Sequence, residues 1–596
     1  MIADNQGNKT LFSNNMRNLL LILFMLITVP GISQKGQPPN VLLIITDDQG
    51  YGDLGFHGNP IIWTPHLDKL AAASVRLNNF YVSPVCAPTR SSLMTGRYSL
   101  RTGVHDTYNG GAIMSGDEVT IAEVLKKAGY RTGAFGKWHL GDNYPSRPGD
   151  QGFDESVVHL SGGMGQPGDF TTYFQFDRSY FDPVLWHNGQ QEPYEGYCTD
   201  IFTRVALAFI EQHQAGPFFC YLAYNAPHTP LQVPDHYYQM YRDVDPEKGF
   251  VNDDRPFPEM TEQDREDARR VYAMVSNIDD NVGKLLQKLK DLGIEQNTMV
   301  IFMTDNGPQQ RRYIAGMRGR KGSVYRGGVR VPCFILYPGQ WEDDRDIDIT
   351  TAHIDLLPTI ASVCGAPLPR GVKIDGRDLL PLIDGVSVDW QNRPLFFYWT
   401  RKYPELYQNM ALQKGPYKLV GHTSFDAEIT EFQLYNIETD PYELENLVDK
   451  QEGLALELKK EMDKHYYDLV AAPHLVNQPR ISIGNEHENP VYLNRNDAAG
   501  ERGIWTQEER YGKWTVSIER GTYDIEYRFI KPVGGVGTLY LEAGTMIQQK
   551  SFNQDMTDRL IIKDLFLPAM ETDLIPFYEA DDKRYFPLYL KITRTD

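Results

Sequence analysis

Nearly continuous apolar runs alternate with helical patterns along the N-terminal part of the chain. Residues 40–45, 218–224 and 299–303 are such runs, and they are typical of parallel strands that are covered on both faces. The longest predicted helix covers 262–292, and the other clear segments are helices at 67–73 and 121–128 and a strand at 130–135. This alternation predicts an α/β fold with a large mixed, mostly parallel sheet flanked by helices.

The pattern changes twice towards the C-terminus. From about residue 396, short strands at 417–420 and 432–436 precede a helix that ends near Tyr467. Beyond about residue 475, polar residues alternate with apolar or aromatic ones at 514–519, 522–530 and 538–542, with glycine turns between them. We expect an α/β domain at 38–395, a small antiparallel sheet-plus-helix subdomain at 396–475 and an appended all-β, sandwich-like domain at 476–596.

The first 37 residues are expected to be a targeting segment, with the true start at Met1 or Met16. Arg17 precedes the apolar stretch 19–29, which is shorter than the roughly 20 residues of a membrane span. A buried helix is the alternative interpretation of this stretch. We expect an exported protein, periplasmic or secreted, with no membrane span.

The net charge of the chain narrows the classes of molecule that it can bind. The formal net charge of −20 over 596 residues argues against general binding to nucleic acids or anionic membranes, which requires basic surfaces. An anionic substrate can bind only where local cations overcome this charge.

The chain has five cysteines. Cys220 and Cys333 lie in predicted buried strands and are expected to be free thiols, and the sequence does not settle other pairings.

Acidic and amide side chains directly follow two of the predicted strands. Asp47 and Asp48 follow the first strand, and Asp305 and Asn306 follow the strand at 299–303. Because ligands of such sheets gather beyond the carboxyl ends of the strands, we expect these oxygens to lie together. Hard oxygen ligands favour calcium, with magnesium as the less suitable ion. The alternative is that either pair only forms turns or caps helices.

Basic side chains occur in three further segments. Lys137 and His139 alternate in 136–141 and are expected to point the same way from an extended segment. His228 follows the strand at 218–224, and Lys321 lies in a glycine-rich loop at 318–328. Fixed cations of this kind stabilise the charge of a transferring sulfuryl or phosphoryl group. Taken singly, each is as well explained by a structural or solvated role.

The segment from Cys86 to Arg97 resembles the maturation signature of sulfatases. In that signature a cysteine, a proline two residues on and an arginine four residues on are read by a formylglycine-generating enzyme, and Cys86, Pro88 and Arg90 match it. The third position is usually serine, so Thr89 is a departure. The alternative is a buried structural cysteine near the start of a helix.

The resemblance to formylglycine-dependent sulfatases covers about residues 38–470 and implies an alkaline-phosphatase-like fold. It implies that Cys86 becomes Cα-formylglycine, whose hydrated aldehyde attacks sulfur. The implied metal ligands are Asp47, Asp48, residue 86, Asp305 and Asn306. The implied catalytic residues are Arg90 and Lys137 on the hydrated aldehyde, Asp305 in deprotonating it, Lys137 and Lys321 on the sulfate oxygens, His228 as the acid for the leaving alcohol and His139 as the base that expels sulfate.

We therefore expect a sulfate-ester hydrolase that acts on sulfated carbohydrates. A phosphodiesterase or phosphonate monoester hydrolase of the same superfamily is the main alternative, and a carbohydrate-binding protein without activity is the third. Both histidines are expected to titrate near the working pH. Candidates without assigned roles are Ser161, as a further polar ligand, and His57, Tyr108, His159, Trp186 and Arg401, as pocket-lining residues.

Overall fold

The computed structural model describes Met1 and residues 38–596, except 249–258, 342–343, 387–389, 391 and 502. Residues 39–596 form one compact unit. The expected targeting segment lies outside the described residues, apart from Met1. Among the described helices, none combines the length and apolar character needed to cross a membrane.

The α/β part is built on one mixed sheet. Within the described residues it has ten strands, and its centre, β9-β1-β8-β4-β5, is parallel. The strands in spatial order are β11 (Arg345–Ile347), β2 (Val75–Leu77), β10 (Cys333–Leu336), β9 (Thr298–Thr304), β1 (Asn40–Thr46), β8 (Phe218–Ala223), β4 (Arg131–Lys137), β5 (Glu155–His159), β6 (Val184–His187) and β7 (Gln190–Pro193). The predicted apolar runs are the central strands, because both faces of the sheet are covered.

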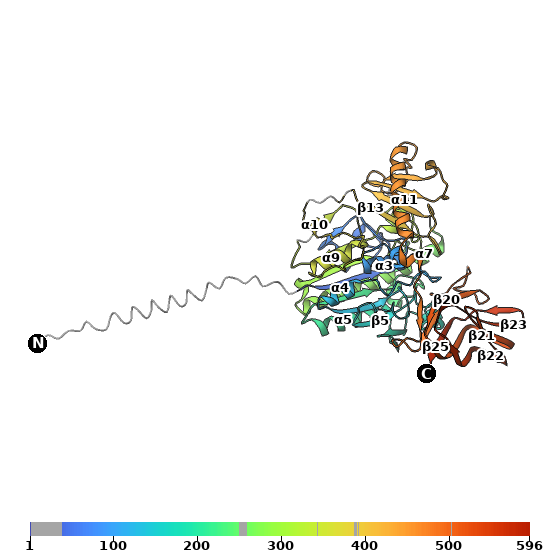
Figure 1. Ribbon diagram of the computed structural model, residues 1–596. Helices are drawn as coiled ribbons and strands as arrows, with labels where there is room; N and C mark the ends of the chain where they lie inside the picture. Colours follow the sequence, from blue (N-terminus) through green and yellow to red (C-terminus); the bar gives the residue numbers. More distant parts are fainter. Residues whose placement is uncertain (2–37, 249–258, 342–343, 387–389, 391, 502) are drawn as a thin grey trace. The chain divides into compact units, whose positions relative to one another are not determined.

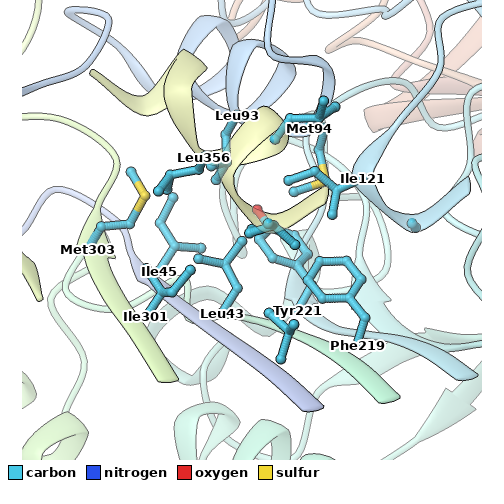
Figure 2. Close-up of a cluster of buried hydrophobic side chains, with 14 of the residues drawn as sticks. Leu43, Ile45, Leu93, Met94, Ile121, Phe219, Tyr221, Ile301, Met303 and Leu356 are labelled. Carbon is cyan, nitrogen blue, oxygen red and sulfur yellow. The ribbon is translucent and has the colours of Figure 1, made fainter. Parts of the chain in front are cut away.

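Helices pack on both faces of this sheet. One face buries side chains against α3 (Cys86–Thr95), α4 (Ile121–Lys127) and α9 (Leu356–Val363); Figure 2 shows residues of β1, β8 and β9 pointing towards these helices. The other face packs against α2 (Pro65–Ala72), α5 (Cys198–His213) and α7 (Glu262–Asp291). Shorter helices are α6 (Asp235–Tyr241), α8 (Arg326–Val329) and α10 (Leu380–Ile383). A further two-stranded sheet pairs β3 (Phe80–Tyr81) with β12 (Thr351–Ala352).

A small antiparallel sheet follows in the chain. Its strands are β13 (Pro394–Tyr398), β14 (Met410–Lys414), β15 (Tyr417–Gly421) and β16 (Gln433–Asn436). Its core includes apolar residues of α11 (Glu452–Val470), and the short helix α12 (Pro473–Val476) follows. The predicted sheet-plus-helix unit is therefore present.

The C-terminal residues form the expected β-rich domain (Figure 1, orange to red). Its strands are β17 (Ile481–Ile483), β18 (Val491–Asn494), β19 (Ala499–Gly500), β20 (Gly512–Ile518), β21 (Gly521–Ala543), β22 (Met546–Leu567), β23 (Met570–Ala580), β24 (Lys583–Tyr585) and β25 (Tyr589–Arg594). The pairing is antiparallel except between β17 and β20. Alternate residues of β21 are buried, so one face of the sheet covers a single core.

One predicted boundary in this domain is wrong. The separate strands expected at 522–530 and 538–542 are one strand, β21, and the glycines between them form no turn. The pairing with β22 shifts its register between Arg528 and Gly535, which marks an irregularity within the strand. A Cβ on Gly537 would lie 2.2 Å from the hydroxyl oxygen of Tyr578, so this glycine permits a close approach of neighbouring strands.

The α/β fold class, the small antiparallel unit and the β-rich domain are confirmed. All five cysteines are buried free thiols, as expected for Cys220 and Cys333. Both of these lie in central or neighbouring strands of the large sheet.

Candidate active site

Two adjacent parallel strands deliver the acidic residues to one edge of the sheet. Thr46 of β1 pairs with Thr304 of β9, so the residues that follow both strands leave the sheet side by side. The backbone N–H of Asp48 donates to Oδ1 of Asp305 over 3.2 Å, and Nδ2 of Asn306 donates to Oδ1 of Asp48 over 2.8 Å. All four side chains, including Asp47, are fully buried.

The backbone around this edge is tightly constrained. Asp48 has a φ of 62°, a left-handed conformation that aspartate tolerates better than most residues. A Cβ on Gly307 would lie 1.9 Å from the carbonyl oxygen of Gly327, so only glycine lets the loop after β9 pass this close. Strained conformations of this kind cluster at functional sites.

Asp47, Asp48, Asp305 and Asn306 together form the acidic edge of the sheet. Cys86 is the first residue of α3 and is buried beside this acidic edge. One ligand atom each from Asp47, Cys86 and Asp305 can be chosen so that all lie within 4.8 Å of one another. Arg90, one turn further along the helix, donates from Nε and Nη2 to Oδ2 of Asp305 over 3.2 and 2.9 Å. Its Nη1 donates to the carbonyl oxygen of Lys137 over 3.0 Å.

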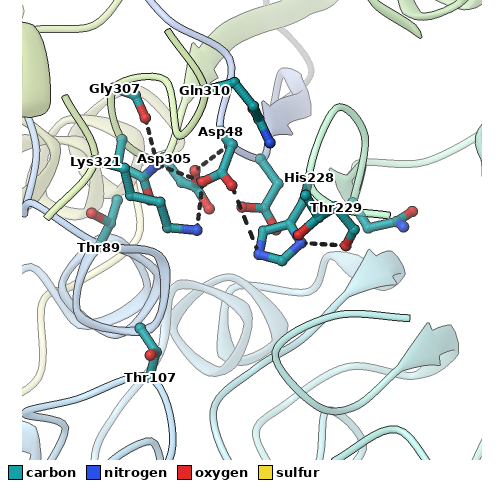
Figure 3. A network of polar contacts seen from close by, with 12 residues as sticks. Asp48, Thr89, Thr107, His228, Thr229, Asp305, Gly307, Gln310 and Lys321 are labelled. Carbon is teal, nitrogen blue, oxygen red and sulfur yellow. Dashed lines mark hydrogen bonds and ion pairs between the residues drawn. The ribbon is translucent and has the colours of Figure 1, made fainter. Parts of the chain in front are cut away.

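Three further basic side chains face the carboxylates. Lys137, at the end of β4, forms a buried ion pair with Oδ2 of Asp47. Nζ of Lys321 lies 2.6 Å from Oδ1 of Asp48, and Nε2 of His228 lies 3.7 Å from Oδ2 of the same residue. Figure 3 shows Lys321 and His228 pointing towards Asp48 from different loops.

The two histidines have defined tautomers. Nε2 of His139 lies 2.7 Å from the carbonyl oxygen of Thr107, and Nδ1 of His228 lies 2.7 Å from that of Thr229. Because a carbonyl oxygen only accepts, these nitrogens carry the protons. Nδ1 of His139 and Nε2 of His228 are therefore the acceptor nitrogens of the neutral rings.

The expected extended geometry of the Lys137–His139 segment is wrong. The strand ends at Lys137, and His139 has a left-handed φ of 59°. Its backbone N–H donates to Leu160 over 2.8 Å. His139 therefore reaches the site through a turn after β4.

The carboxylates titrate differently because of their neighbours. Burial acts to raise the pKa of Asp47, but Lys137, His228 and Arg90 together hold that pKa far below its usual value. Burial and repulsion by Asp47 raise the pKa of Asp305 to about 7, against the opposing effects of Arg90 and Lys137. Carboxylates this close favour either a shared proton or a bound cation.

Burial also shifts the pKa values of Cys86 and of the two histidines. It raises the pKa of the Cys86 thiol, which keeps an unmodified cysteine protonated and weakly nucleophilic. Burial and Lys321 lower the pKa of His228 to about 4, although Asp48 and Asp47 act to raise it. Burial and Lys137 also lower the pKa of His139 well below its usual value, so the expectation that both rings titrate near neutrality is wrong for the protein without ligands.

The donor set fits a hard divalent cation. Oδ1 of Asp47, Oδ2 of Asp48 and Oδ1 of Asn306 are buried and accept no hydrogen bond from any described residue. Buried acceptors without donors are costly, and a calcium or magnesium ion satisfies such oxygens directly. Asp47, Asp48 and His228 also bring ligand atoms within 4.8 Å of one another.

A cavity of about 590 Å³ opens onto this cluster. Among its lining residues are Cys86, Thr107, His139, Gly162, His228, Gln310, Arg320, Lys321, Trp399, Arg401 and Trp505. The cavity thus exposes residue 86, both histidines and Lys321, while Asp47, Arg90 and Lys137 are buried behind them. A ligand of the size of a sugar can approach residue 86 from this side.

The candidates without assigned roles lie at different distances from the cavity: some line or border it, and others do not. Arg401 lines the cavity, and Tyr108 stacks on the cavity residue Trp505. His159 is buried behind the cavity, and Ser161 is buried one residue before Gly162. His57 stacks on Tyr51, and Trp186 packs against Phe170 and Tyr492; neither lines the cavity.

Sequence reasoning missed several residues around the site. Arg312 donates to the carboxylate of Asp53 and, over 2.7 Å, to the carbonyl oxygen of Asp48. These bonds hold the left-handed backbone conformation of Asp48 in place. Trp399 and Trp505 line the cavity from segments far from the acidic motifs. The sequence carried no local signal for these residues, because their contacts join distant parts of the chain.

Comparisons with known proteins agree on one family. The sequence matches the sulfatase family over residues 39–366, and the family described as N-sulphoglucosamine sulphohydrolase, C-terminal, over residues 320–470. Arylsulfatase A of Homo sapiens is 33% identical over 67% of this chain and 77% of that protein. N-acetylgalactosamine-6-sulfatase of Canis lupus familiaris is 33% identical over 63% of this chain and 72% of that protein.

Solved structures are similar in the same region. The structure described as Ps i-CgsB in complex with k-i-k-neocarrahexaose has a TM-score of 0.63 and 30% identity, and covers 73% of this chain and 94% of that chain. The phosphonate monoester hydrolase of Agrobacterium radiobacter has a TM-score of 0.55 and 18% identity over 72% of this chain and 96% of that chain. At that identity the likeness is one of fold alone.

Proposed function

Since this chain belongs to the sulfatase family and is a sulfuric ester hydrolase, we propose that its substrates are sulfated glycans and that residue 86 supplies the nucleophile. The observation that carries the proposal is that Cys86 and the acidic residues beside it meet four basic side chains next to one cavity, namely Arg90, Lys137, His228 and Lys321. A panel of sulfated monosaccharides and oligosaccharides, scored by sulfate release, tests it.

The glycan class rests on two supports. One relative is named for N-acetylgalactosamine 6-sulfate, and a similar structure was solved with neocarrahexaose. The cavity of about 590 Å³ combines aromatic and charged walls, as expected for a site that binds sugar rings with anionic groups. Release of sulfate from aryl sulfates alone, and from no sugar in the panel, would contradict this class.

We propose that a maturation enzyme converts Cys86 to Cα-formylglycine, which supplies a hydrated aldehyde for attack on sulfur. Two observations support the need for such a change: Cys86 is buried, and the raised pKa of its thiol disfavours a thiolate. In the proposal, Arg90 and Lys137 hold the oxygens of residue 86 in place. Both side chains are already fixed by ion pairs with Asp305 and Asp47.

Asp47, Asp48, Asp305, Asn306 and residue 86 would hold a divalent ion, and we propose calcium, with magnesium as the alternative. The ion would supply positive charge next to the nucleophile and the sulfate oxygens. Asp47, Asp48 and Asn306 each carry a buried oxygen that accepts no hydrogen bond from the described part of the chain, which supports an oxygen-bound cation.

Lys321 and Lys137 are proposed to bind the sulfate oxygens, and the histidines to move protons. Nε2 of His228 is the nitrogen that faces Asp48, so a protonated ring would present this N–H towards the leaving oxygen. A sulfate ester bound between Lys321 and His228 would offset the charge of Lys321, which lowers the pKa of the histidine. Nδ1 of His139 is unpartnered among the described residues and is available to accept a proton.

His228→Ala is expected to damage hydrolysis of poor leaving groups more than that of good ones. A sugar alcohol leaves as a strongly basic alkoxide and needs a proton, whereas nitrophenolate hardly does. General-acid help amounts to about 10²–10⁴-fold, so a sugar sulfate should lose most of that factor and 4-nitrophenyl sulfate much less. Steady-state kcat/KM values for the two substrates measure the difference.

His139→Ala serves as the comparison variant, because it removes the other imidazole of the same cavity. It should lower kcat for both substrates to a similar extent and leave kcat/KM near the wild-type value, since the proposed base acts after the alcohol has left. Equal losses on both substrates for His228→Ala would contradict its role as the acid.

The main alternative is a phosphodiesterase or phosphonate monoester hydrolase. It has a neighbour in fold alone, whereas relatives with sulfatase names reach 33% identity. Rates on 4-nitrophenyl sulfate, bis(4-nitrophenyl) phosphate and a phenyl phosphonate monoester separate the two activities. Faster turnover of either phosphorus ester would reverse the assignment.

We also propose that the protein is exported. The support is the apolar stretch 19–29 after Arg17, which has the pattern of a signal peptide. Mass spectrometry of protein from the periplasm or medium should find a chain that lacks this stretch. A full-length chain confined to the cytoplasm would contradict the proposal.

A further inference from the structure

The β-rich domain contributes a side chain to the cavity of the proposed active site. Trp505 lies between β19 and β20 and lines the same cavity as Cys86, His139 and Lys321. Among the described residues that line the cavity, Trp505 is the one that belongs to the β-rich domain. The domain is therefore more than a separate module attached beside the cavity.

Trp505 belongs to a continuous aromatic wall. Its ring stacks on Tyr108 at a centroid distance of 5.0 Å and an interplanar angle of 15°. The guanidinium of Arg401 lies 4.4 Å from the centroid of Tyr108 and 4.8 Å from that of Trp399. Three segments that are distant in sequence thus contribute three aromatic rings and one cation, which stack in the order Trp505, Tyr108, Arg401 and Trp399. Each group in this stack restricts the position of its neighbour.

The loop that carries Tyr108 joins the wall to the rest of the site. Nη1 of Arg401 donates to Oδ1 of Asp106 over 2.6 Å and to Oγ1 of Thr107 over 3.0 Å. The carbonyl oxygen of the same Thr107 accepts from Nε2 of His139. Residues 106–108 therefore position the wall and the proposed catalytic base together.

The β-rich domain holds Trp505 from a packed core. Ile504 is buried in that core, which also contains Ile113 and contacts Tyr108 of the α/β part. The backbone N–H of Gly500 donates to Oδ1 of Asn109 over 2.9 Å. Arg495, itself fully buried, donates to the carbonyl oxygen of Ile504 over 3.0 Å. The position of Trp505 is thus set by the packing between the two parts.

The chemistry of the wall suits a sugar ring with an acidic substituent. Aromatic faces pack against the apolar C–H faces of a ring, and their polar edges face water. Arg401 uses Nη1 for its protein partners among the described residues, and its side chain is 43% exposed. Its outer N–H groups are free to bind a sulfate or carboxylate in a bidentate manner.

We propose that Trp505, Tyr108, Trp399 and Arg401 form a second subsite, which binds the sugar next to the sulfated one together with an acidic group on that neighbour. This inference rests on the proposed glycan sulfatase function and deepens it: the preferred substrate is an anionic oligosaccharide of at least two rings. The β-rich domain then acts in substrate selection by completing this subsite.

The first experiment compares Trp505→Ala with Trp505→Phe and with Trp63→Ala. Trp63 is a matched control, because it is a tryptophan of the same chain that is 61% exposed and does not line the cavity. The probes are 4-nitrophenyl sulfate, neocarrahexaose and a chondroitin 6-sulfate hexasaccharide. Thermal melting of each variant checks that the fold is retained.

Trp505→Ala is expected to lower kcat/KM for a hexasaccharide substrate about 10–100-fold, mainly through KM, as truncation of an aromatic anchor residue in a binding site does. Turnover of 4-nitrophenyl sulfate should change less than about 2-fold, since this small probe has no second sugar ring to bind at the proposed subsite. Trp505→Phe should recover most of the loss, and Trp63→Ala should match the wild type. Equal losses on small and large substrates, or an equal effect of Trp63→Ala, would overturn the proposal.

Arg401→Gln tests the acidic group separately. It should weaken binding of neocarrahexaose about 10-fold or more, whereas the chemically desulfated form, which has no acidic group left, should bind the variant and the wild type equally. Equal weakening of both forms would overturn the role of Arg401 in binding an acidic substituent.

Binding to the Cys86→Ala protein separates this inference from the proposed function. If the wild type releases sulfate from no sugar, the proposed function fails, and calorimetry with the same hexasaccharides still tests the wall. Weaker binding after Trp505→Ala would support the subsite. No binding of either hexasaccharide to the Cys86→Ala protein would overturn it.

Discussion

Replacing Cys86 by alanine should lower sulfate release by at least about 10⁴-fold, because it removes the proposed nucleophile while the binding groups stay in place. Alanine is smaller than cysteine, and residue 86 faces the cavity, so melting should change little. Sulfate release and thermal melting, measured on the same preparation, check both statements.

Cys333→Ala is the matched control for this experiment. Cys333 is also a buried free thiol, but it lies in β10 within the hydrophobic core. Its replacement should lower thermal stability through a small cavity and leave kcat near the wild-type value. Comparable activity of the Cys86→Ala and wild-type proteins would contradict the assignment of residue 86.

Removal of the proposed divalent ion, or Asp305→Asn, should reduce sulfate release by at least about 10³-fold, since both disturb the charge balance next to the proposed nucleophile. Chelation should also lower the melting temperature by several degrees, because a bound ion stabilises only the folded state. Asp47, Asp48 and Asp305 would then face one another without the divalent ion between them. Added calcium should restore activity and melting temperature together.

Asp355→Asn provides a control for Asp305→Asn. Asp355 is a fully buried carboxylate paired with Arg393, at 2.7 Å, and it does not line the cavity. Its replacement should destabilise the fold, as breaking a buried ion pair does, yet calcium should still raise the melting temperature. Restoration of activity by zinc alone would contradict the oxygen-ligand site.

The large sheet was predictable because its strands are buried on both faces. Apart from Asn40, the runs at 40–45, 218–224 and 299–303 consist of apolar and aromatic residues, and they form β1, β8 and β9. The prediction of two separate strands was wrong for β21, where Gly534, Gly535 and Gly537 suggested a turn. Glycine occurs in turns, in bulges and at close strand contacts, so the sequence of β21 alone does not distinguish them; the contacts with neighbouring strands do.

The candidate site was predictable where a motif lies at the end of a strand. Asp47, Asp48, Asp305 and Asn306 meet because β1 and β9 are neighbours with matched ends. Cys86 and Arg90 join them because they lie one turn apart on α3. Motif and strand order together therefore placed the acidic edge and the proposed nucleophile.

Other features of the site depend on tertiary contacts that leave no local pattern. The left-handed turn at His139 follows from its backbone contact with Leu160. The lowered pKa of His228 follows from burial and from Lys321, which is distant in sequence. Trp505 lines the cavity from the β-rich domain, whose core also contains Ile113 of the α/β part and therefore joins two separately predicted domains.

The most direct test of the account is the mass of the peptide that contains residue 86, measured together with activity on protein from a host with a maturation system. We predict a peptide about 18 Da lighter than the cysteine form, because an aldehyde replaces the thiol, and activity that rises in proportion to its share. Fully active protein in which residue 86 is intact cysteine would contradict the account.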